Sequence, residues 1–519
     1  MMTHCISPGK ETTDTVANGI ENIFSYSDGS SNGMADFIGA NFINPRYGFG
    51  EDVVVEGAQR LRAMGSKSIK FYLSPNYKTY YEPYTDFGEY SSPVELAQDP
   101  SFRAMMDMDF NTFFIGAYVF ANNYATYWKD SLTPEQKQAE YDAMYDLTYY
   151  LCTQYAGTNK TFILQNWEGD WSCMDVANPA TDPGDEVFQR MIEWTNIRQD
   201  AVNDARRDAN QAGVRVYHAL EVNLLDKAMK GGKTVANNVI PYTYCDYYSY
   251  SAYDTESDPE KFAAALDYLR EKAQNNLIPG KSRIYVGEFG LPENEFGTKS
   301  VMNVVKSVTE ICRAKGIDYI LYWQLYDNEV YDPSVSVYDQ TDKNCRGYWL
   351  IKPSGRKTDM WNYFYKLING EDDPEFVAQE PEKSEYAQLE ITLGETNDCK
   401  GLTQKDAADG VCTATEIGGK PCRVTPAANP NLYMYFNADD DYLTEEDRHL
   451  EVTFTYYDNG TAPIVLEYWN QNNALASQTV LRTGTDTWLT ATLRLSDAKF
   501  DNGFHGGFAD FRFSDYNEP

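Results

Sequence analysis

Two glutamates stand at the ends of apolar segments, in settings that suit acid–base chemistry. Glu168 follows the segment TFILQNW and lies between Trp167 and Trp171, whereas Glu288 lies in the GEFG of RIYVGEFG. Two carboxyl groups that face one cleft can cleave a glycosidic bond, because one protonates the leaving oxygen while the other attacks the anomeric carbon or activates water. The two indoles would desolvate Glu168 and raise its pKa, and Asp170 would raise that pKa further by charge repulsion, as a proton donor requires.

Other polar and aromatic side chains stand at the ends of the remaining apolar segments. We expect the following residues to contact a substrate or to support the two glutamates: Lys70, Asn166, Trp167, Asp170, Trp171, His218, Asn223, Tyr253 and Trp323. Asp170, on the same loop as Glu168, and Glu221, on the next segment, are alternative candidates for the proton donor. Asn166 is expected to bind a substrate hydroxyl, whereas His218 could equally be a structural histidine.

Eight short apolar segments alternate with amphipathic helices and must position these residues. We predict strands at 37–44, 68–74, 112–120, 161–167, 214–223, 247–253, 283–290 and 319–326. The segments between them carry apolar residues at three- and four-residue intervals, and several end in Gly. Eight strand–helix units predict a closed (β/α)8 barrel, whose catalytic residues come from the carboxyl ends of the strands. An open doubly wound sheet is the alternative, but no GxGxxG motif opens a helix after the first strand.

The pattern changes after about residue 370. The acidic, Pro-bearing run GEDDPEFVAQEPEKS predicts a linker at 371–384. Beyond it, short strands alternate with Gly, Asn and Asp turns, which predicts an antiparallel β-sandwich or jelly roll at 385–519 that could bind carbohydrate. The catalytic barrel is expected at 36–370, after an N-terminal segment at 1–35 that is poorly structured or packs on the barrel.

Composition narrows the possible partners. The chain has 78 acidic and 44 basic residues, and its net charge of −34 should repel nucleic acid and anionic membranes. The longest strongly apolar stretch, around 113–121, is far shorter than the roughly 20 residues of a membrane helix. We therefore expect neither nucleic acid nor a membrane as partner. We also expect the protein to be a monomer. An extracellular or secretory location is expected, although the first residues lack the apolar core of a signal peptide.

Metal ligands and cysteines give weaker signals. No His, Cys, Asp and Glu residues stand at the spacing of a zinc site, so we predict no catalytic metal or other cofactor. The acid-rich segment FNADDDYLTEED is a candidate for a structural calcium site in the C-terminal domain, with a solvated turn as the alternative. Of the 9 cysteines, Cys399, Cys412 and Cys422 lie in a loop-rich stretch that could hold one disulfide.

The run RIYVGEFGLPEN resembles the seventh-strand motif of the retaining (β/α)8 glycoside hydrolases of clan A, the superfamily of the family 5 cellulases and mannanases. The resemblance covers about residues 36–370. It implies that Glu288 is the nucleophile and Glu168 the acid/base. YYSYSAY is similar to the sixth-strand element, which implies that Tyr253 binds the nucleophile, and YILYWQLYDNE resembles the eighth-strand element, which implies that Trp323 stacks under the sugar.

The chain departs from this family at three positions. The family usually has Asn directly before the acid/base, whereas here Trp167 separates Asn166 from Glu168. Lys70 stands where the family often has Arg, and it offers a compact charge in place of a forked donor. Ser251 stands where some members have His.

Together these features predict a retaining glycoside hydrolase that cleaves O-glycosidic bonds of a poly- or oligosaccharide, with β-linkages favoured by analogy. Two alternatives stay open. A barrel that keeps the cleft but not turnover would be a non-catalytic carbohydrate-binding protein, and an enzyme that passes the sugar to another sugar would be a transglycosylase.

Overall fold

The computed structural model describes residues 33–50, 52–81, 85–121, 124–273, 284–378, 388–407, 409–425, 433–439, 442, 450–500, 502–504 and 508–514. The chain divides into two compact units, residues 1–377 and residues 378–519. Most of the predicted N-terminal segment and much of the predicted linker lie outside the described residues.

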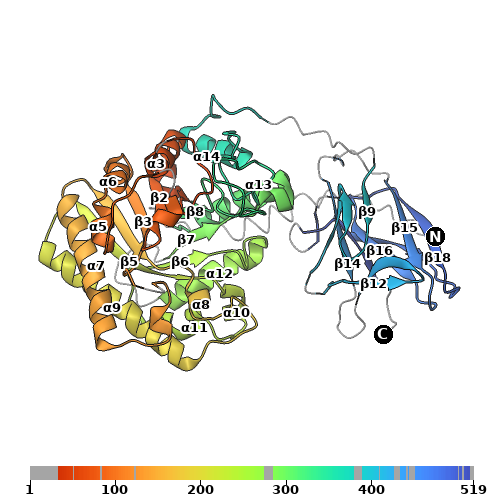
Figure 1. Ribbon diagram of the computed structural model, residues 1–519, viewed down its shortest axis with the longest axis horizontal. Helices are drawn as coiled ribbons and strands as arrows, with labels where there is room; N and C mark the ends of the chain where they lie inside the picture. Colours follow the sequence, from red (N-terminus) through yellow and green to blue (C-terminus); the bar gives the residue numbers. More distant parts are fainter. Residues whose placement is uncertain are drawn as a thin grey trace, which may run out of the picture. The chain divides into compact units, whose positions relative to one another are not determined.

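The first unit is a closed barrel of eight parallel strands surrounded by helices (Figure 1). Each strand pairs with the next along the chain, and β1 pairs with β8 to close the barrel. This order confirms the predicted (β/α)8 barrel and rules out an open sheet. The strands of the barrel are β1 (Ile38–Asn41), β2 (Ser68–Leu73), β3 (Thr112–Ala117), β4 (Lys160–Gln165), β5 (Val214–Val222), β6 (Tyr247–Ser251), β7 (Ile284–Phe289) and β8 (Ile320–Tyr322).

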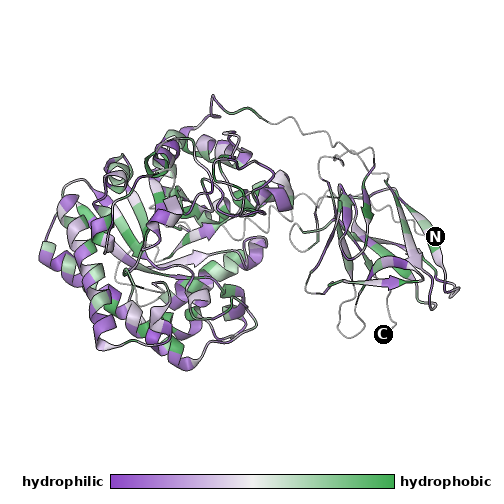
Figure 2. Cartoon of the chain, in the orientation of Figure 1, coloured by the Kyte–Doolittle hydropathy of each residue, from purple (hydrophilic) through white to green (hydrophobic). Residues whose placement is uncertain are grey.

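Long helices cover the barrel, and shorter ones lie in the loops. The long helices are α3 (Val53–Met64), α6 (Pro100–Asp107), α7 (Pro134–Gln154), α9 (Asp185–Ala209), α12 (Pro259–Lys272), α13 (Glu293–Ala314) and α14 (Asp359–Asn369). The short elements are α2 (Met34–Phe37), α4 (Tyr77–Tyr81), α5 (Pro93–Ala97), η1 (Tyr127–Lys129), α8 (Gly169–Ser172), α10 (Leu225–Met229), α11 (Val235–Asn238) and η2 (Ile240–Tyr242). Apolar residues gather on the strands and on the inner helix faces, while the outer faces are polar (Figure 2).

Local sequence signals set the helix ends. The helix α7 begins at a capping box, in which Thr133 accepts from the peptide N–H of Gln136 and the Gln136 side chain accepts from the peptide N–H of Thr133. The carboxylate of Asp52 caps α3 in a similar way, by accepting from peptide N–H groups of its first turn. At the other end, α3 stops at Gly65 and α14 stops at Gly370, both with a positive φ that glycine adopts without strain.

The second unit consists of antiparallel strands. A five-stranded sheet in the order β11-β14-β19-β16-β17 packs against the β15–β18 pair through a core that includes Phe436, Leu466, Leu493 and Phe511. The predicted antiparallel sandwich is thereby confirmed. Its strands are β9 (Glu390–Thr392), β10 (Asp398–Lys400), β11 (Leu402–Lys405), β12 (Thr413–Ile417), β13 (Lys420–Val424), β14 (Met434–Ala438), β15 (Leu450–Tyr457), β16 (Ile464–Trp469), β17 (Leu475–Val480), β18 (Trp488–Leu495) and β19 (Phe511–Ser514).

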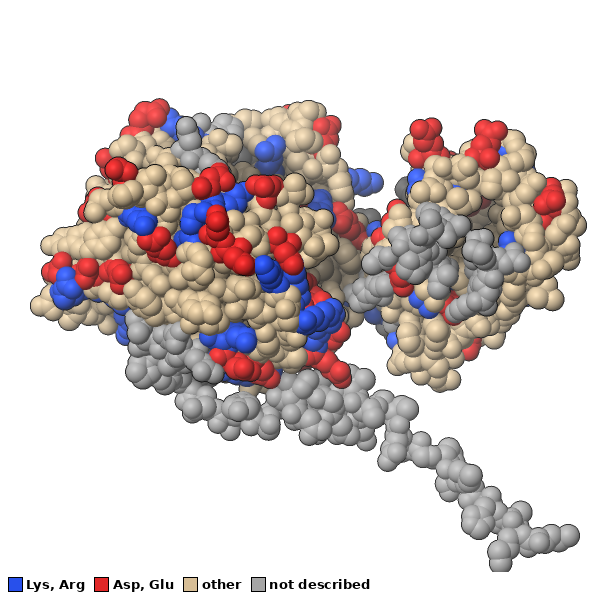
Figure 3. All heavy atoms as spheres, turned by 90° about the horizontal axis from the view of Figure 1, so that it is seen from below, with Lys and Arg blue, Asp and Glu red and all other residues tan. Residues whose placement is uncertain are grey.

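The protein surface carries charged side chains of both signs. On the face drawn in Figure 3, Lys and Arg side chains lie among Asp and Glu side chains.

The eight cysteines that the structure describes, Cys399, Cys412 and Cys422 among them, are free thiols, so the disulfide expected between two of these three is not formed. Within the described part of the chain, no helix has the length and apolar content to cross a membrane.

Candidate active site

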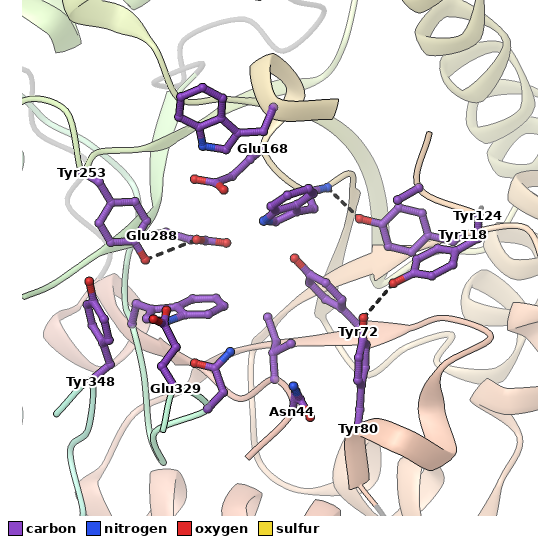
Figure 4. Close-up of a pocket in the computed structure, with 16 residues that line it drawn as sticks. Asn44, Tyr72, Tyr80, Tyr118, Tyr124, Glu168, Tyr253, Glu288, Glu329 and Tyr348 are labelled. Carbon is purple, nitrogen blue, oxygen red and sulfur yellow. Dashed lines mark hydrogen bonds between the residues drawn. The ribbon is translucent and has the colours of Figure 1, made fainter. Parts of the chain in front are cut away.

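A cavity of about 550 Å³ lies at the carboxyl ends of the barrel strands (Figure 4). Its wall is formed by Ile43, Asn44, Tyr72, Tyr80, Tyr118, Tyr124, Ala125, Trp167, Glu168, Trp171, Tyr253, Glu288, Trp323, Asn328, Glu329 and Tyr348. Six of the residues singled out from the sequence are therefore brought together here. They are the two glutamates, Trp167, Trp171, Tyr253 and Trp323.

Glu288 extends from β7 to the cavity and is only 2% exposed. Its Oε1 accepts a hydrogen bond of 2.8 Å from Nζ of Lys70, and its Oε2 accepts one of 3.3 Å from the hydroxyl of Tyr253. Burial raises the pKa of Glu288 to about 7, against the opposing charge of Lys70 and with a further rise from Glu221. Glu288 therefore ionises near neutral pH, and a donor binds each of its oxygens.

Glu168 faces Glu288 across the cavity (Figure 4). It follows β4 at the start of α8, and among the described residues none donates a hydrogen bond to its carboxylate. Burial raises the pKa of Glu168 well above its ordinary value, the charges of Glu288 and Glu221 raise it further, and Lys70 opposes them. Burial and the neighbouring carboxylates therefore favour the protonated form of Glu168, whereas the charge of Lys70 favours the ionised form of Glu288, which is the division of roles that an acid and a nucleophile need.

The aromatic wall holds these carboxyl groups away from bulk water. Trp167 and Trp171 flank Glu168, and the peptide N–H of Trp167 donates to the hydroxyl of Tyr118 over 2.7 Å. Trp323 follows β8, is 9% exposed and joins Gln324 through a cis peptide bond. Flat apolar rings with polar edges suit a sugar ring, whose C–H face packs on them while its hydroxyls reach polar groups.

Sequence reasoning did not assign several residues of this wall. Tyr72 lies two positions after Lys70 on β2. Its ring packs directly against Gly116, where a Cβ would lie 2.4 Å from the ring, and its buried hydroxyl has no partner among the described residues. Tyr118 follows β3, and Tyr348 lies in the loop after β8. A signal was present for Tyr72, because alternate residues of a strand share one face. Lys70 at the barrel interior therefore places Tyr72 there too.

The short helix α4, which follows β2, carries three tyrosines with two different roles. Tyr80 reaches the cavity, where its hydroxyl bonds that of Tyr124 over 2.7 Å. Tyr77 and Tyr81 are buried against apolar residues of the barrel unit instead. This helix thus contributes the ring of Tyr80 to the cavity, whereas Tyr77 and Tyr81 pack in the core.

Five predicted substrate contacts lie outside the cavity wall. Lys70 is fully buried and donates to protein acceptors. Asn166 accepts from the peptide N–H of Glu221 over 3.0 Å and so ties β4 to β5. The Asp170 carboxylate accepts three peptide N–H bonds, one of them from Asn223, whose side chain accepts from the Asp170 N–H in return. These bonds fix the loop that carries Glu168, and they direct Asp170 away from the proton-donor position.

His218, the fifth of these residues, lies on the outer side of the barrel wall. Its Nε2 accepts a hydrogen bond of 3.2 Å from the guanidinium of Arg198 on α9. Burial and the nearby arginine lower the pKa of His218 well below its ordinary value, so the ring is neutral. The residue packs a helix on the sheet, as the alternative interpretation of the sequence had it.

Metal ligands are not grouped in the described part of the chain. There, no three His, Cys, Asp or Glu side chains stand close enough to hold a metal ion. Most of the calcium candidate FNADDDYLTEED lies outside the described residues.

Comparisons with known proteins find distant structural neighbours. No protein-family profile and no curated protein matches the sequence. The chain is similar to a GH5_18 protein from Streptomyces cattleya in complex with GlcNAc, at 13% identity and a TM-score of 0.42 over 65% of this chain and 80% of that one. It is also similar to a family 39 glycoside hydrolase from Bacteroides cellulosilyticus WH2, at 10% identity and a TM-score of 0.40 over 93% and 82%. A third neighbour is a family 5 xyloglucanase from Paenibacillus pabuli, at 12% identity and a TM-score of 0.39 over 64% and 98%. Likeness this distant carries no statement about activity, so the function rests on the site itself.

Proposed function

We propose that the chain is a glycoside hydrolase that cleaves O-glycosidic bonds of a β-linked oligo- or polysaccharide with retention of configuration. The observation that carries this proposal is the pair of glutamates on one cavity with unlike surroundings. Glu288 is bound by Lys70 and Tyr253, whereas the carboxylate of Glu168 has no such donors among the described residues and its pKa is raised well above its ordinary value. This difference supports one ionised and one protonated carboxyl group at neutral pH.

In the first step, an oxygen of Glu288 attacks the anomeric carbon. The bond from that carbon to the leaving oxygen breaks, and the proton of Glu168 passes to the leaving oxygen. In the second step, water attacks the same carbon, gives a proton to Glu168 and releases the carboxylate of Glu288. Two inversions return the original configuration at the anomeric carbon.

The wall residues support a carbohydrate ligand. Trp323, Trp167 and Trp171 offer ring faces, and the buried hydroxyl of Tyr72 offers a hydrogen bond without a protein partner among the described residues. The side-chain oxygen of Asn328 is a second buried atom of the wall for which the described part of the chain supplies no partner. Stacked rings beside unpaired polar atoms match the mixed surface of a sugar.

The direct test combines a polysaccharide panel with matched variants. Wild-type protein, Glu168→Gln and Glu288→Gln are incubated with β-glucans, xyloglucan, mannans and aryl glycosides, and reducing ends are counted. We expect hydrolysis by the wild type and losses of at least about 10²–10³-fold for each variant. Glu186→Gln, an exposed change on α9, is the control and should keep full activity. Near wild-type turnover by Glu288→Gln would refute the assignment.

Product analysis separates the alternatives. NMR of the first product should show the same anomeric configuration as the substrate, and the opposite configuration would refute retention. Glycan binding without any release of reducing ends over the panel would favour the non-catalytic binding protein. Products longer than the substrate would favour the transglycosylase. A monomeric state, an extracellular location and carbohydrate binding by the second unit stay predictions.

A further inference from the structure

A third carboxylate, Glu221, is fully buried beneath the cavity. Its Oε2 accepts hydrogen bonds from Gln165 over 2.8 Å, from Ser249 over 2.8 Å and from Nζ of Lys70 over 3.1 Å. Its Oε1 accepts a bond of 3.2 Å from the peptide N–H of Glu168. Four donors, one of them charged, therefore bind the two oxygens of a carboxylate that has no access to water.

Lys70 joins this carboxylate to Glu288. Its Nζ donates to Glu288 over 2.8 Å, to Glu221 over 3.1 Å and to the carbonyl of Gly287 over 3.3 Å, so all three of its protons are used. Burial lowers the pKa of Lys70, but the two carboxylates outweigh burial and hold it above its ordinary value. One positive charge therefore lies between two negative ones.

Two glycines make room for Glu221. Gly287 directly precedes Glu288, and a Cβ placed on it would lie 2.5 Å from Oε2 of Glu221. Gly169 directly follows Glu168, and a Cβ placed on it would lie 2.6 Å from the carbonyl oxygen of Glu221. Each cavity glutamate thus has a neighbour without a side chain at the point where Glu221 packs.

The charges change when Glu288 becomes an ester in the proposed reaction. The carboxylate of Glu288 then loses its charge, and if Glu288 were the only partner of Lys70, this lysine would become a buried cation without a counter-charge, which is costly. Glu221 takes no part in bond making and keeps its charge throughout. It can therefore balance Lys70 in both states of Glu288.

We propose, on the basis of the function proposed above, that Glu221 is a positioning residue that holds the counter-charge of Lys70 constant while Glu288 alternates between carboxylate and ester. Through the peptide N–H of Glu168 it also fixes the backbone of the proton donor. Glu221 thereby links the two cavity glutamates, Glu288 through Lys70 and Glu168 through its peptide N–H, without touching the substrate.

The first test is the pH dependence of Glu221→Gln, with Glu221→Asp as the charge-preserving variant. A negative charge near Glu288 and Glu168 raises the pKa of both groups, so its removal lowers both. We expect kcat to fall at least tenfold in Glu221→Gln and both limbs of the kcat/KM profile, which reports the free enzyme, to move to lower pH by about one unit. Glu221→Asp should keep both limbs in place. A lower kcat with unmoved limbs in Glu221→Gln would overturn the proposal, because a merely structural role predicts that result.

The second test needs no turnover. Thermal unfolding is measured for Glu221→Gln, Glu288→Gln and the double variant, where the uncharged amide introduced by Glu288→Gln stands for the esterified state of the nucleophile. Each single variant leaves Lys70 one carboxylate, whereas the double variant leaves none. We expect the double variant to lose clearly more melting temperature than the two singles together, or to fail to fold when both singles fold. Additive losses would overturn the proposal.

The two proposals fail in different ways. If the wild-type protein cleaves no glycoside, the proposed hydrolase function is refuted. The thermal unfolding of the single and double variants then still tests whether Glu221 balances the charge of Lys70. A hydrolase with additive unfolding losses keeps its function and excludes the role of Glu221.

Discussion

Replacing Lys70 by Met should destabilise the barrel in a way that depends on pH. Lys70 is fully buried and neutralises two carboxylates at 2.8 and 3.1 Å. Met has a similar length and no charge, so the change leaves Glu221 and Glu288 as buried negative charges side by side. Breaking a buried ion pair by removing one partner costs about 3–5 kcal/mol. We expect a loss of that size in the free energy of unfolding at pH 7.5.

The sign of the pH dependence follows from linkage. Burial already raises the pKa of Glu288 in the folded state, and loss of the opposing Lys70 charge moves that pKa further above the roughly 4.3 of an unfolded chain. A raised carboxyl pKa costs stability as pH rises from the unfolded value to the folded value. The deficit of Lys70→Met should therefore be large at pH 7.5 and shrink towards pH 4.5, where Glu288 takes up a proton.

The assay is guanidinium unfolding followed by tryptophan fluorescence at pH 4.5, 6 and 7.5. Lys233→Met is the control, because Lys233 pairs with Asp185 at the surface, with side chains 45% and 79% exposed. Surface pairs contribute about 0–1 kcal/mol, so this control should change little at any pH. A deficit below about 1 kcal/mol for Lys70→Met at pH 7.5, or one that does not vary with pH, would refute the reasoning.

Three further variants test single contacts. The 3.3 Å hydrogen bond from Tyr253 lowers the pKa of Glu288, and Tyr253→Phe removes this bond. We therefore expect kcat to fall about tenfold and the acid limb of the pH–rate profile to move to higher pH. An acid limb that does not move would contradict this prediction. Tyr72→Phe removes a buried hydroxyl that has no partner among the described residues. Steady-state kinetics should show a raised KM, and the melting temperature should stay equal or rise. A lower melting temperature would show that the hydroxyl forms a hydrogen bond in the folded protein. Burial raises the pKa of Glu256 to about 8. Ionisation of this group should therefore lower the free energy of unfolding of the wild type by at most about 5 kcal/mol between pH 4.5 and 8. Urea unfolding of Glu256→Gln over the same pH range should not show this loss.

Much of the barrel follows from the sequence alone. Its eight strands are short apolar segments and its helices carry a clear period, because each strand is buried on both faces and each helix on one. The same pattern places Glu168 and Glu288 at strand ends, and parallel strands in a closed barrel bring those ends to one face. In the second unit, β10 to β13 contain no fully buried residue, so no apolar face marks these strands in the sequence.

The direction of each polar side chain was decided only by the tertiary structure. On β5, His218 and Glu221 lie three positions apart and so point to opposite sides of the wall, His218 to Arg198 on a helix and Glu221 to Lys70 inside. Asp170 follows Glu168 by two residues, yet peptide N–H groups from distant loops take up its carboxylate.

Residue types and local periods therefore determined which groups could carry chemistry and at which end of the barrel they lie. The tertiary structure determined which of those groups share the cavity. The physical reason is that the proton affinity and the orientation of a buried carboxyl group depend on partners contributed by other strands, and the local sequence does not contain them.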